Sequence, residues 1–509
     1  MRDFVEVKSF FCSRVFLLYV LVFVLGVVLR FVPELFSSVY PAGCDIPFYV
    51  YELKIMEQGL SWDQLYFGNP LVYLVLLFIR GVTQLDWFVL MKFFSPFLNG
   101  CVAASFLYFL RNGLDLDWKP HEYLLCVVLL LFSSSGIIMS NSLLKQQLAL
   151  IFLFLFLVAY KRKDFRLELL FAVLVVCSHQ LISVVLFGFV AVDLVVRLVR
   201  HDGLWIRGLG LLFAVFLSIF VVTFLLPILG SVDPMRELML HISTYFDNSS
   251  YGFRYNATPI LERVVYHFRW YYDWWIVFVG FAFVRFHKQK TVNILLLVLF
   301  VLSFIPVGTS WARFQWLLVY PFAVLFVGGT KSIRLWKYDF GGWSLKPLRY
   351  VFLLLIIVLG SSLLVNTNWS MPRSSVPFED IPIIKGNYEF LSPYVTENSL
   401  IIEYDVTLSW DKNFYFDDGK DVTILSVRTV SFFVEDGSLW LYRGGIKGHD
   451  FWIYRVPNMK LCLDDYDNVF VTNVDWFVDM YGLKDYWQYF DRFGSYDGPA
   501  VYRYNGNIN

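Results

Sequence analysis

Long apolar stretches separated by short polar connections occupy residues 1–366 of the chain. A helix that crosses a bilayer needs about 20 mostly apolar residues, because every backbone polar group in lipid must bond within its own segment. The pattern predicts about eleven spans by this criterion. They lie near residues 14–32, 88–110, 122–141, 145–160, 167–181, 183–198, 206–229, 271–286, 291–308, 313–332 and 349–366.

Composition agrees with a polytopic α-helical membrane protein. Hydrophobic residues make up 58% of the 509 residues and charged residues 17%, whereas soluble domains have about 45–50% and about 25%. Six cysteines are too few for a disulfide scaffold. The balance of 42 Lys and Arg against 42 Asp and Glu argues against a nucleic-acid partner. Membrane lipid is the expected surroundings of the chain.

The basic connections predict the orientation in the membrane, because short loops rich in Lys and Arg stay on the cytoplasmic side. The most basic loop is 161–166, and alternation over eleven spans places four further connections on its side. All four are basic, and they carry Arg111 and Lys119; Arg197, Arg200 and Arg207; Arg285, Lys288 and Lys290; and Lys331, Arg334, Lys337, Lys346 and Arg349. We therefore expect a multi-pass protein of the cell membrane with a cytoplasmic N-terminus.

The same alternation places residues 33–87, 230–270 and 367–509 outside the cell. Three Asn-X-Ser/Thr sequons lie in the external segments and none in the internal loops, in agreement with the charge pattern. They begin at Asn248, Asn256 and Asn368.

The tail from Thr367 has a different composition. It contains 12 Lys and Arg against 21 Asp and Glu, a net charge of −9, so residues 1–366 carry +9. Short β-rich runs alternate with two helical candidates near 384–394 and 474–490, which predicts a small extracytoplasmic α/β domain at 367–509. The β-rich runs are 400–404, 422–427, 439–442, 451–454, 469–472 and 500–504. Cys44 and Cys462 are the two external cysteines, and whether they pair depends on their separation.

The first external loop contains the most informative carboxylate. Asp45 precedes Ile46-Pro47, where a helix is expected to begin, and Tyr49 and Glu52 follow on its helical face. Ionisable groups at the membrane face often line a pocket. A helix N-cap with Pro in the first turn is the structural alternative for Asp45.

The order of elements in this loop resembles the GT-C superfamily. The helix after Asp45 is expected to end at Gly59, and Asn69-Pro-Leu-Val-Tyr73 then opens an interfacial apolar run that ends at Arg80 and is too short to cross the membrane. GT-C enzymes are membrane glycosyltransferases that use sugars linked to polyprenyl or dolichyl phosphate, including protein mannosyltransferases and aminoarabinose transferases. The resemblance implies that residues 1–366 form the catalytic module, that Asp45 is the catalytic carboxylate, and that the source is archaeal.

Three further residues are candidates for binding the donor phosphate or sugar. Arg313, in the run Thr309–Ala323, is similar to the late Arg…Pro span of GT-C enzymes, although an Arg there can also extend to lipid headgroups. Cys177-Ser-His179-Gln is similar to the Ser/Thr-His turn of related archaeal and bacterial glycosyltransferases, and a structural His179 is the alternative. Lys145 opens a span at the outer face, either as a phosphate ligand or as an interfacial anchor.

These residues predict inverting transfer of a sugar to a glycan, lipid or protein hydroxyl, with Asp45 as general base and cations stabilising the departing phosphate. Carboxylate, water and phosphate oxygens suffice to hold Mg²⁺ or Mn²⁺, so a divalent ion near Asp45 is left open.

Other functions fit the sequence less well. An oligosaccharyltransferase would carry Trp-Trp-Asp-Tyr-Gly in the tail, and no such motif occurs there; Asp273-Trp274-Trp275 has the wrong order and place. A lipid-linked-sugar flippase or transporter would favour charges in mid-span and repeated broken helices. A glycan polymerase or ligase on another multi-pass fold is the third alternative, and a structural scaffold leaves the acidic first loop unexplained.

Overall fold

A computed structural model describes 14–37, 41–43, 46–57, 69–114, 116–201, 205–222, 290–304, 314, 316–332, 351, 354, 357–358, 361, 386, 388–396, 398–403, 422–426, 431–435, 438–442, 459–462, 466–471, 490–494 and 501–504. The chain divides into two compact units. The first comprises Met1–Gly43 and Gly59–Ser370, and the second comprises Cys44–Gln58 and Met371–Asn509.

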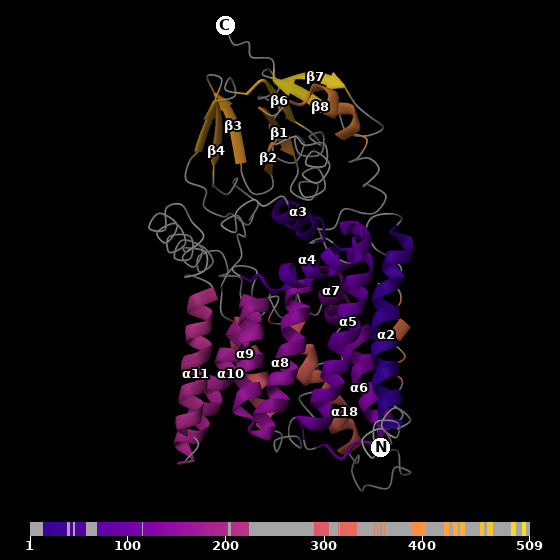
Figure 1. Ribbon diagram of the computed structural model, residues 1–509, viewed down its shortest axis with the longest axis vertical. Coiled ribbons are helices and arrows are strands. Elements are labelled where there is room, and N and C mark those ends of the chain that lie inside the picture. The colour runs from indigo at the N-terminus through magenta and orange to yellow at the C-terminus, as the bar shows by residue number, and fades with distance from the viewer. Residues whose placement is uncertain are drawn as a thin grey trace, which may run out of the picture. The chain divides into compact units, whose positions relative to one another are not determined.

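The first unit is helical throughout its described part (Figure 1). Its helices are α2 (Arg14–Phe36), α4 (Leu71–Thr83), α5 (Trp87–Asn112), α6 (Pro120–Phe132), α7 (Ser134–Ser142), α8 (Leu144–Arg162), α9 (Phe165–Ser178), α10 (Gln180–Val199), α11 (Trp205–Phe220), α16 (Lys290–Phe304) and α18 (Val319–Ser332).

Within the described residues, α2, α5, α8 and α10 are each long and apolar enough to cross a membrane, and the bent pair α6–α7 makes a fifth candidate. A multi-pass membrane protein is therefore supported. The total of eleven spans stays a prediction, since the expected span 271–286 lies outside the described residues. The expected interfacial run is α4, which is too short to cross upright.

The predicted continuous span 122–141 differs from the structure, because α6 and α7 meet at a 67° bend. Ser133 lies between them in an extended conformation and bonds to both helices. Its Oγ donates to the Leu130 carbonyl at 2.7 Å and accepts the Gly136 N–H at 3.0 Å. A Cβ at Gly136 would lie 2.1 Å from the Leu130 carbonyl oxygen, so only glycine fits this bend. Serine favours such caps because its hydroxyl competes for backbone groups.

The helix termini gather at two ends of the bundle. At one end, which we call the basic end, the Arg111 guanidinium lies 5.8 Å from the ring of Tyr19, near the start of α2, and that of Arg162 lies 5.7 Å from Tyr108. The other end, which we call the α7 end, contains α7 and the C-terminal end of α2 (Figure 1). The order in which the chain crosses the membrane, and which end faces the cytoplasm, stay predictions from the loop charges.

Aromatic side chains join three helices in the interior of the first unit. The ring centroids of Phe106 on α5, Phe154 on α8 and Tyr320 on α18 lie 5.1–5.3 Å apart in all three pairs. Such tilted and edge-on contacts stabilise the fold beyond the contribution from burying the rings.

Two glycines lie at a close contact between α2 and α5. A Cβ at Gly26 would lie 3.0 Å from the Cα of Gly100, and a Cβ at Gly100 would lie 2.7 Å from Val27 Cγ2. Asn99 Nδ2 donates to the Gly26 carbonyl at 2.8 Å across the same contact. Small residues let two helix backbones approach closely. Such packing matters in a membrane, because no hydrophobic force drives helices to associate there.

The second unit contains α3 (Ile46–Glu57) and two sheets. The strands are β1 (Ser399–Glu403), β2 (Thr423–Ser426), β3 (Ser431–Glu435), β4 (Ser438–Tyr442), β5 (Met459–Cys462), β6 (Asn468–Val471), β7 (Phe490–Gly494) and β8 (Val501–Tyr504). The larger sheet has the order β2-β1-β6-β8-β7, with β1 parallel to β2 and β6 and with β8 antiparallel to β6 and β7. The other is the antiparallel sheet β3-β4-β5.

The larger sheet has its own apolar core of Leu391, Val395, Ile401 and Phe470. Five of the expected β-rich runs coincide with strands, while 451–454 lies outside the described residues. Strands β3, β5 and β7 were not expected. Residues 388–391 of the first helical candidate are helical; the second lies outside the described residues except Phe490, which begins β7.

We predict that Gly100→Ala destabilises the protein by about 1–3 kcal/mol, because the added methyl group overpacks the α2–α5 contact. Gly210→Ala on α11 is the matched control, since a Cβ there meets nothing within 4 Å. Thermal unfolding of the two purified proteins in the same detergent measures the difference. Equal melting temperatures would contradict the close contact.

Candidate functional site

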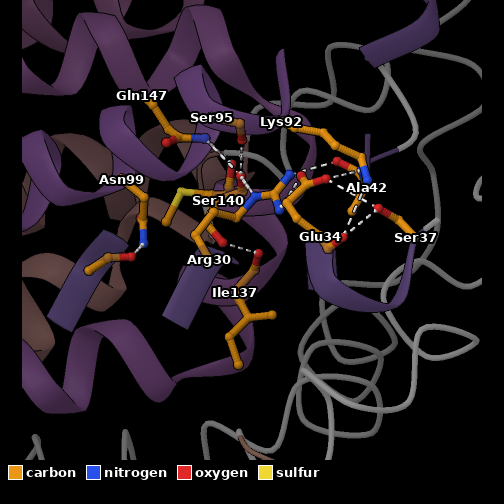
Figure 2. Close-up of polar contacts among 12 residues, drawn as sticks. Arg30, Glu34, Ser37, Ala42, Lys92, Ser95, Asn99, Ile137, Ser140 and Gln147 are labelled. Atoms are coloured by element: carbon orange, nitrogen blue, oxygen red, sulfur yellow. Dashed lines mark hydrogen bonds and ion pairs between the residues drawn. The ribbon is translucent and has the colours of Figure 1, made fainter. Parts of the chain in front are cut away.

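A buried polar cluster lies at the α7 end and involves four helices (Figure 2). Its centre is the carbonyl oxygen of Ser140, near the end of α7, where a helix leaves carbonyls without an intrahelical partner. It accepts from Arg30 Nε on α2 at 2.9 Å, from Gln147 Nε2 on α8 at 3.0 Å and from Ser95 Oγ on α5 at 3.4 Å. The bend between α6 and α7 thus creates an acceptor that gathers donors from three other helices.

Arg30 and Glu34 form an ion pair inside this cluster. Arg30 Nη1 lies 2.8 Å from Glu34 Oε1, and the two side chains are 0% and 1% exposed. The pair holds both backbone groups of Ala42, since Arg30 Nη2 donates to the Ala42 carbonyl at 2.6 Å and the Ala42 N–H donates to Glu34 Oε2 at 2.8 Å. Buried charges need such partners, because removing one leaves the other charge uncompensated. The two charges therefore fix the chain where it leaves α2.

The C-terminal end of α2 has two further polar contacts. Ser37 Oγ donates to the Glu34 carbonyl at 3.0 Å, and Lys92 Nζ on α5 donates to the same carbonyl at 3.4 Å. A cation near the C-terminal end of a helix also interacts favourably with its dipole. Side chains of the protein therefore supply hydrogen-bond donors to this end of α2.

Lys145 lies in the first turn of α8 and is 7% exposed. Its ammonium is 4.4 Å from the centre of the Tyr73 ring on α4, a cation–π contact. No side chain caps the N-terminus of α8, and a helix N-terminus favours a negative charge. The lysine thus lies in surroundings suited to an anion.

His179 is the single residue between α9 and α10, as the predicted turn requires. It is half-buried and extended, with φ −163° and ψ 127°. Asn69, just before α4, donates to the carbonyl of Val176 on α9 at 2.8 Å. The start of α4 therefore contacts both α9 beside His179 and Lys145 on α8, so both candidates lie at the α7 end.

The other predicted site residues are placed differently. Asp45 and Arg313 lie outside the described residues. Tyr49 is buried and Glu52 is half-buried on α3, which begins at Ile46 as the sequence predicts and belongs to the second unit. The roles of all six predicted residues stay predictions. No group of three or more His, Cys, Asp or Glu side chains suited to a metal ion occurs in the described part of the chain.

Sequence reasoning missed Arg30 and Glu34. Their spacing of four places them on one helix face, which was a signal for an ion pair. Their contacts with Ala42 and Ser140 had no local signal, because Ser140 is 110 residues away.

A second network lies at the basic end. Asp193 pairs with Arg197 on the same helix, accepts a hydrogen bond from the Tyr160 hydroxyl, and lies 2.6 Å from Lys290 Nζ on α16. The contacts of Asp193 therefore join α8, α10 and α16. Its carboxylate already has three partners, so it is a structural contact.

Comparisons with known proteins find a likeness among solved structures. No protein-family model matches the sequence, and no curated protein matches it. Among solved structures, the fold is similar to the arabinofuranosyltransferase AftD from Mycobacteria, with a TM-score of 0.43 and 12% identity. The match covers 77% of this chain but 29% of that one, so the chain spans less than a third of its length.

We predict that Gln147→Leu lowers the free energy of unfolding by about 1–3 kcal/mol, because two buried carbonyls, those of Met139 and Ser140, lose a donor. Gln146→Leu is the matched control: this neighbour is equally buried, and its Nε2 donates a weak hydrogen bond to the Met139 sulfur at 3.5 Å. Thermal unfolding should rank Gln147→Leu well below Gln146→Leu. The reverse order would contradict the role given to the Ser140 carbonyl.

Proposed function

We propose that the chain is a GT-C-type membrane glycosyltransferase that moves a sugar from a polyprenyl-phosphate-linked donor to an acceptor hydroxyl. One observation carries the proposal. Lys145 and His179, the two donor-binding candidates in the described first unit, lie at the end of the bundle where α2 leads into the loop of Asp45. Residues far apart in the sequence but related by one predicted chemistry are therefore at one end of the membrane unit.

The reaction is a single displacement. The acceptor hydroxyl oxygen forms a bond with the anomeric carbon while the bond from that carbon to the phosphate oxygen breaks. Asp45 accepts the hydroxyl proton as general base, and the polyprenyl phosphate leaves with the bonding electrons. Because attack and departure take place on opposite sides of the carbon, the anomeric configuration is inverted.

Cationic residues stabilise the charge that develops on the departing phosphate. In this proposal Arg313 binds it bidentately, Lys145 supplies a point charge, and His179 donates a hydrogen bond. Tyr49 and Glu52, on the helix after Asp45, contact the sugar.

The proposed surroundings follow from the loop charges. The α7 end faces the outside, so donor and acceptor meet at the extracytoplasmic surface, with the polyprenyl chain among the spans and lipid. The acceptor is a glycan, a lipid or a protein, and the acidic α/β domain of the tail lies on the same side.

We predict that Asp45→Asn lowers sugar transfer by about 10²–10⁴-fold, the usual contribution of a general base. Membranes that contain native or variant protein would be supplied with a panel of radiolabelled polyprenyl-phosphate sugars, and labelled acceptor would be counted. Glu57→Gln is the matched control, because it makes the same carboxylate-to-amide change at the exposed end of α3. Equal transfer by native protein and Asp45→Asn would refute the assignment of Asp45.

We also predict that Lys145→Gln raises the donor KM by roughly 10- to 100-fold, because a hydrogen bond to a charged group contributes about 1.5–3 kcal/mol. Lys161→Gln, at the basic end, should keep the native KM. A Lys145→Gln variant whose donor KM equals that of native protein would show that Lys145 only anchors α8 on Tyr73.

A further inference from the structure

We propose that the starts of α9 and α11 form a binding surface for the headgroup of an anionic phospholipid. The surface lies at the basic end of the bundle, opposite the α7 end (Figure 1). It is therefore separate from the donor site proposed around Lys145 and His179. We call it the α9–α11 surface and define it by its exposed members Lys161, Lys163, Phe165, Arg166, Arg200 and Trp205.

Two contacts of one arginine bring the starts of α9 and α11 together. Arg207 on α11 forms an ion pair with Glu168 on α9, and its guanidinium lies 5.9 Å from the centre of the Phe165 ring. The Glu168 side chain is 0% exposed and that of Arg207 is 25% exposed. The hairpin α8–α9 and the hairpin α10–α11 therefore contribute their charged ends to one surface.

The described acidic residues of α8, α9, α10 and α11 are all engaged within the protein. Glu168 pairs with Arg207, and Asp193 has the three partners described above. Asp164 caps α9, where it accepts a backbone N–H at 3.3 Å. Because the loop 161–166 contains four cations and this one acid, positive charge remains in excess on the α9–α11 surface.

The position of Arg166 points to an anion more directly than the charge count does. Arg166 and Arg207 lie in the first turns of α9 and α11, where the helix dipole favours a negative charge over a cation. The Glu168 carboxylate offsets the charge of Arg207. Arg166 is exposed and forms no ion pair with a described residue. A bound anion would interact favourably with both this guanidinium and the start of α9.

The apolar neighbours of these cations favour a lipid over a free anion. Phe165 is 43% exposed, Trp205 is 41% exposed and Ile206 is 64% exposed. Tryptophan is enriched where membrane meets water, since its ring has an apolar body and a polar edge. Basic pockets between membrane helices bind anionic headgroups. A phosphate at the cations would place the glycerol and first chain carbons of the lipid against these apolar side chains.

Phosphatidylglycerol titrated onto the full chain in a neutral detergent tests the proposal, with retained lipid measured by native mass spectrometry. We expect Arg166→Gln to weaken binding by about 5-fold and Lys163→Gln/Arg166→Gln by about 25-fold. The reason is that each Lys or Arg near an anionic surface contributes a factor of about five. Both side chains are exposed, so the variants without lipid should melt at the native temperature.

Three comparisons separate this surface from general attraction to a basic membrane end. Lys119→Gln is the matched control, because it removes one exposed charge at the start of α6, and it should keep the native affinity. Phosphatidylcholine, whose headgroup has no net charge, should bind native protein and the double variant equally weakly. Inorganic phosphate should displace phosphatidylglycerol no more than NaCl of the same ionic strength does.

A second measurement uses stability, because a ligand that binds the folded state raises the melting temperature. Phosphatidylglycerol should raise the melting temperature of native protein and of Lys119→Gln. It should raise that of Lys163→Gln/Arg166→Gln much less. A lower melting temperature of the double variant without lipid would instead assign these cations a structural role and overturn the proposal.

Other results would also overturn it. Equal affinity of native protein and the double variant for phosphatidylglycerol would show that the α9–α11 surface does not bind the headgroup. A loss in Lys119→Gln as large as that in Arg166→Gln would mean that binding follows the total charge of the basic end. Stronger displacement by phosphate than by NaCl would identify a site for free anions rather than for lipid.

Discussion

A helix that ends inside a protein leaves carbonyl groups that need donors, and the carbonyl of Ser140 is the point on which the α7 end depends. The bend after α6 ends that helix inside the bundle, and the chain continues as α7. Helices α2, α5 and α8 each supply one hydrogen-bond donor to the Ser140 carbonyl near the end of α7. In lipid an unpaired polar group costs several kcal/mol. Satisfying this one acceptor therefore fixes the relative heights of three helices, and through Arg30 it also fixes the chain that follows α2.

The two ends of the bundle use charge in different ways. At the basic end, Asp193 is neutralised by Arg197 and Lys290 and bonded by Tyr160, so its contacts join helices and leave it saturated. At the α7 end, the charges of Arg30 and Glu34 reach out to a loop backbone, and Lys145 lies over an aromatic ring.

Much of the helical unit could be predicted from the sequence because membrane spans are a matter of length and apolarity. The helix after Asp45 and the turn at His179 were also predicted, since each has a local signal of a few residues. The break at Ser133 was not predicted. The apolar stretch continues across Ser133, so apolarity alone gives no sign of a serine cap there. The hairpin β3–β4 was missed although Asp436-Gly437 between its strands is a strong turn signal. The contacts of Arg30 had no local signal, since its partners lie 12 and 110 residues along the chain.

The single-residue junction at His179 has a consequence for the whole length of α10. A helix turns by about 100° and rises about 1.5 Å per residue, so Asp193 lies about 21 Å along the axis from His179 and at a fixed angle around it. Because only one residue lies between α9 and α10, the connection is too short to compensate for a change in that angle. An insertion or deletion at the junction would rotate Asp193 away from Tyr160 and Lys290. The angular position of residues around α10 thus couples the imidazole of His179 at one membrane face to the ion-pair network of Asp193 at the other. We therefore expect natural length variation in other loops rather than at this junction.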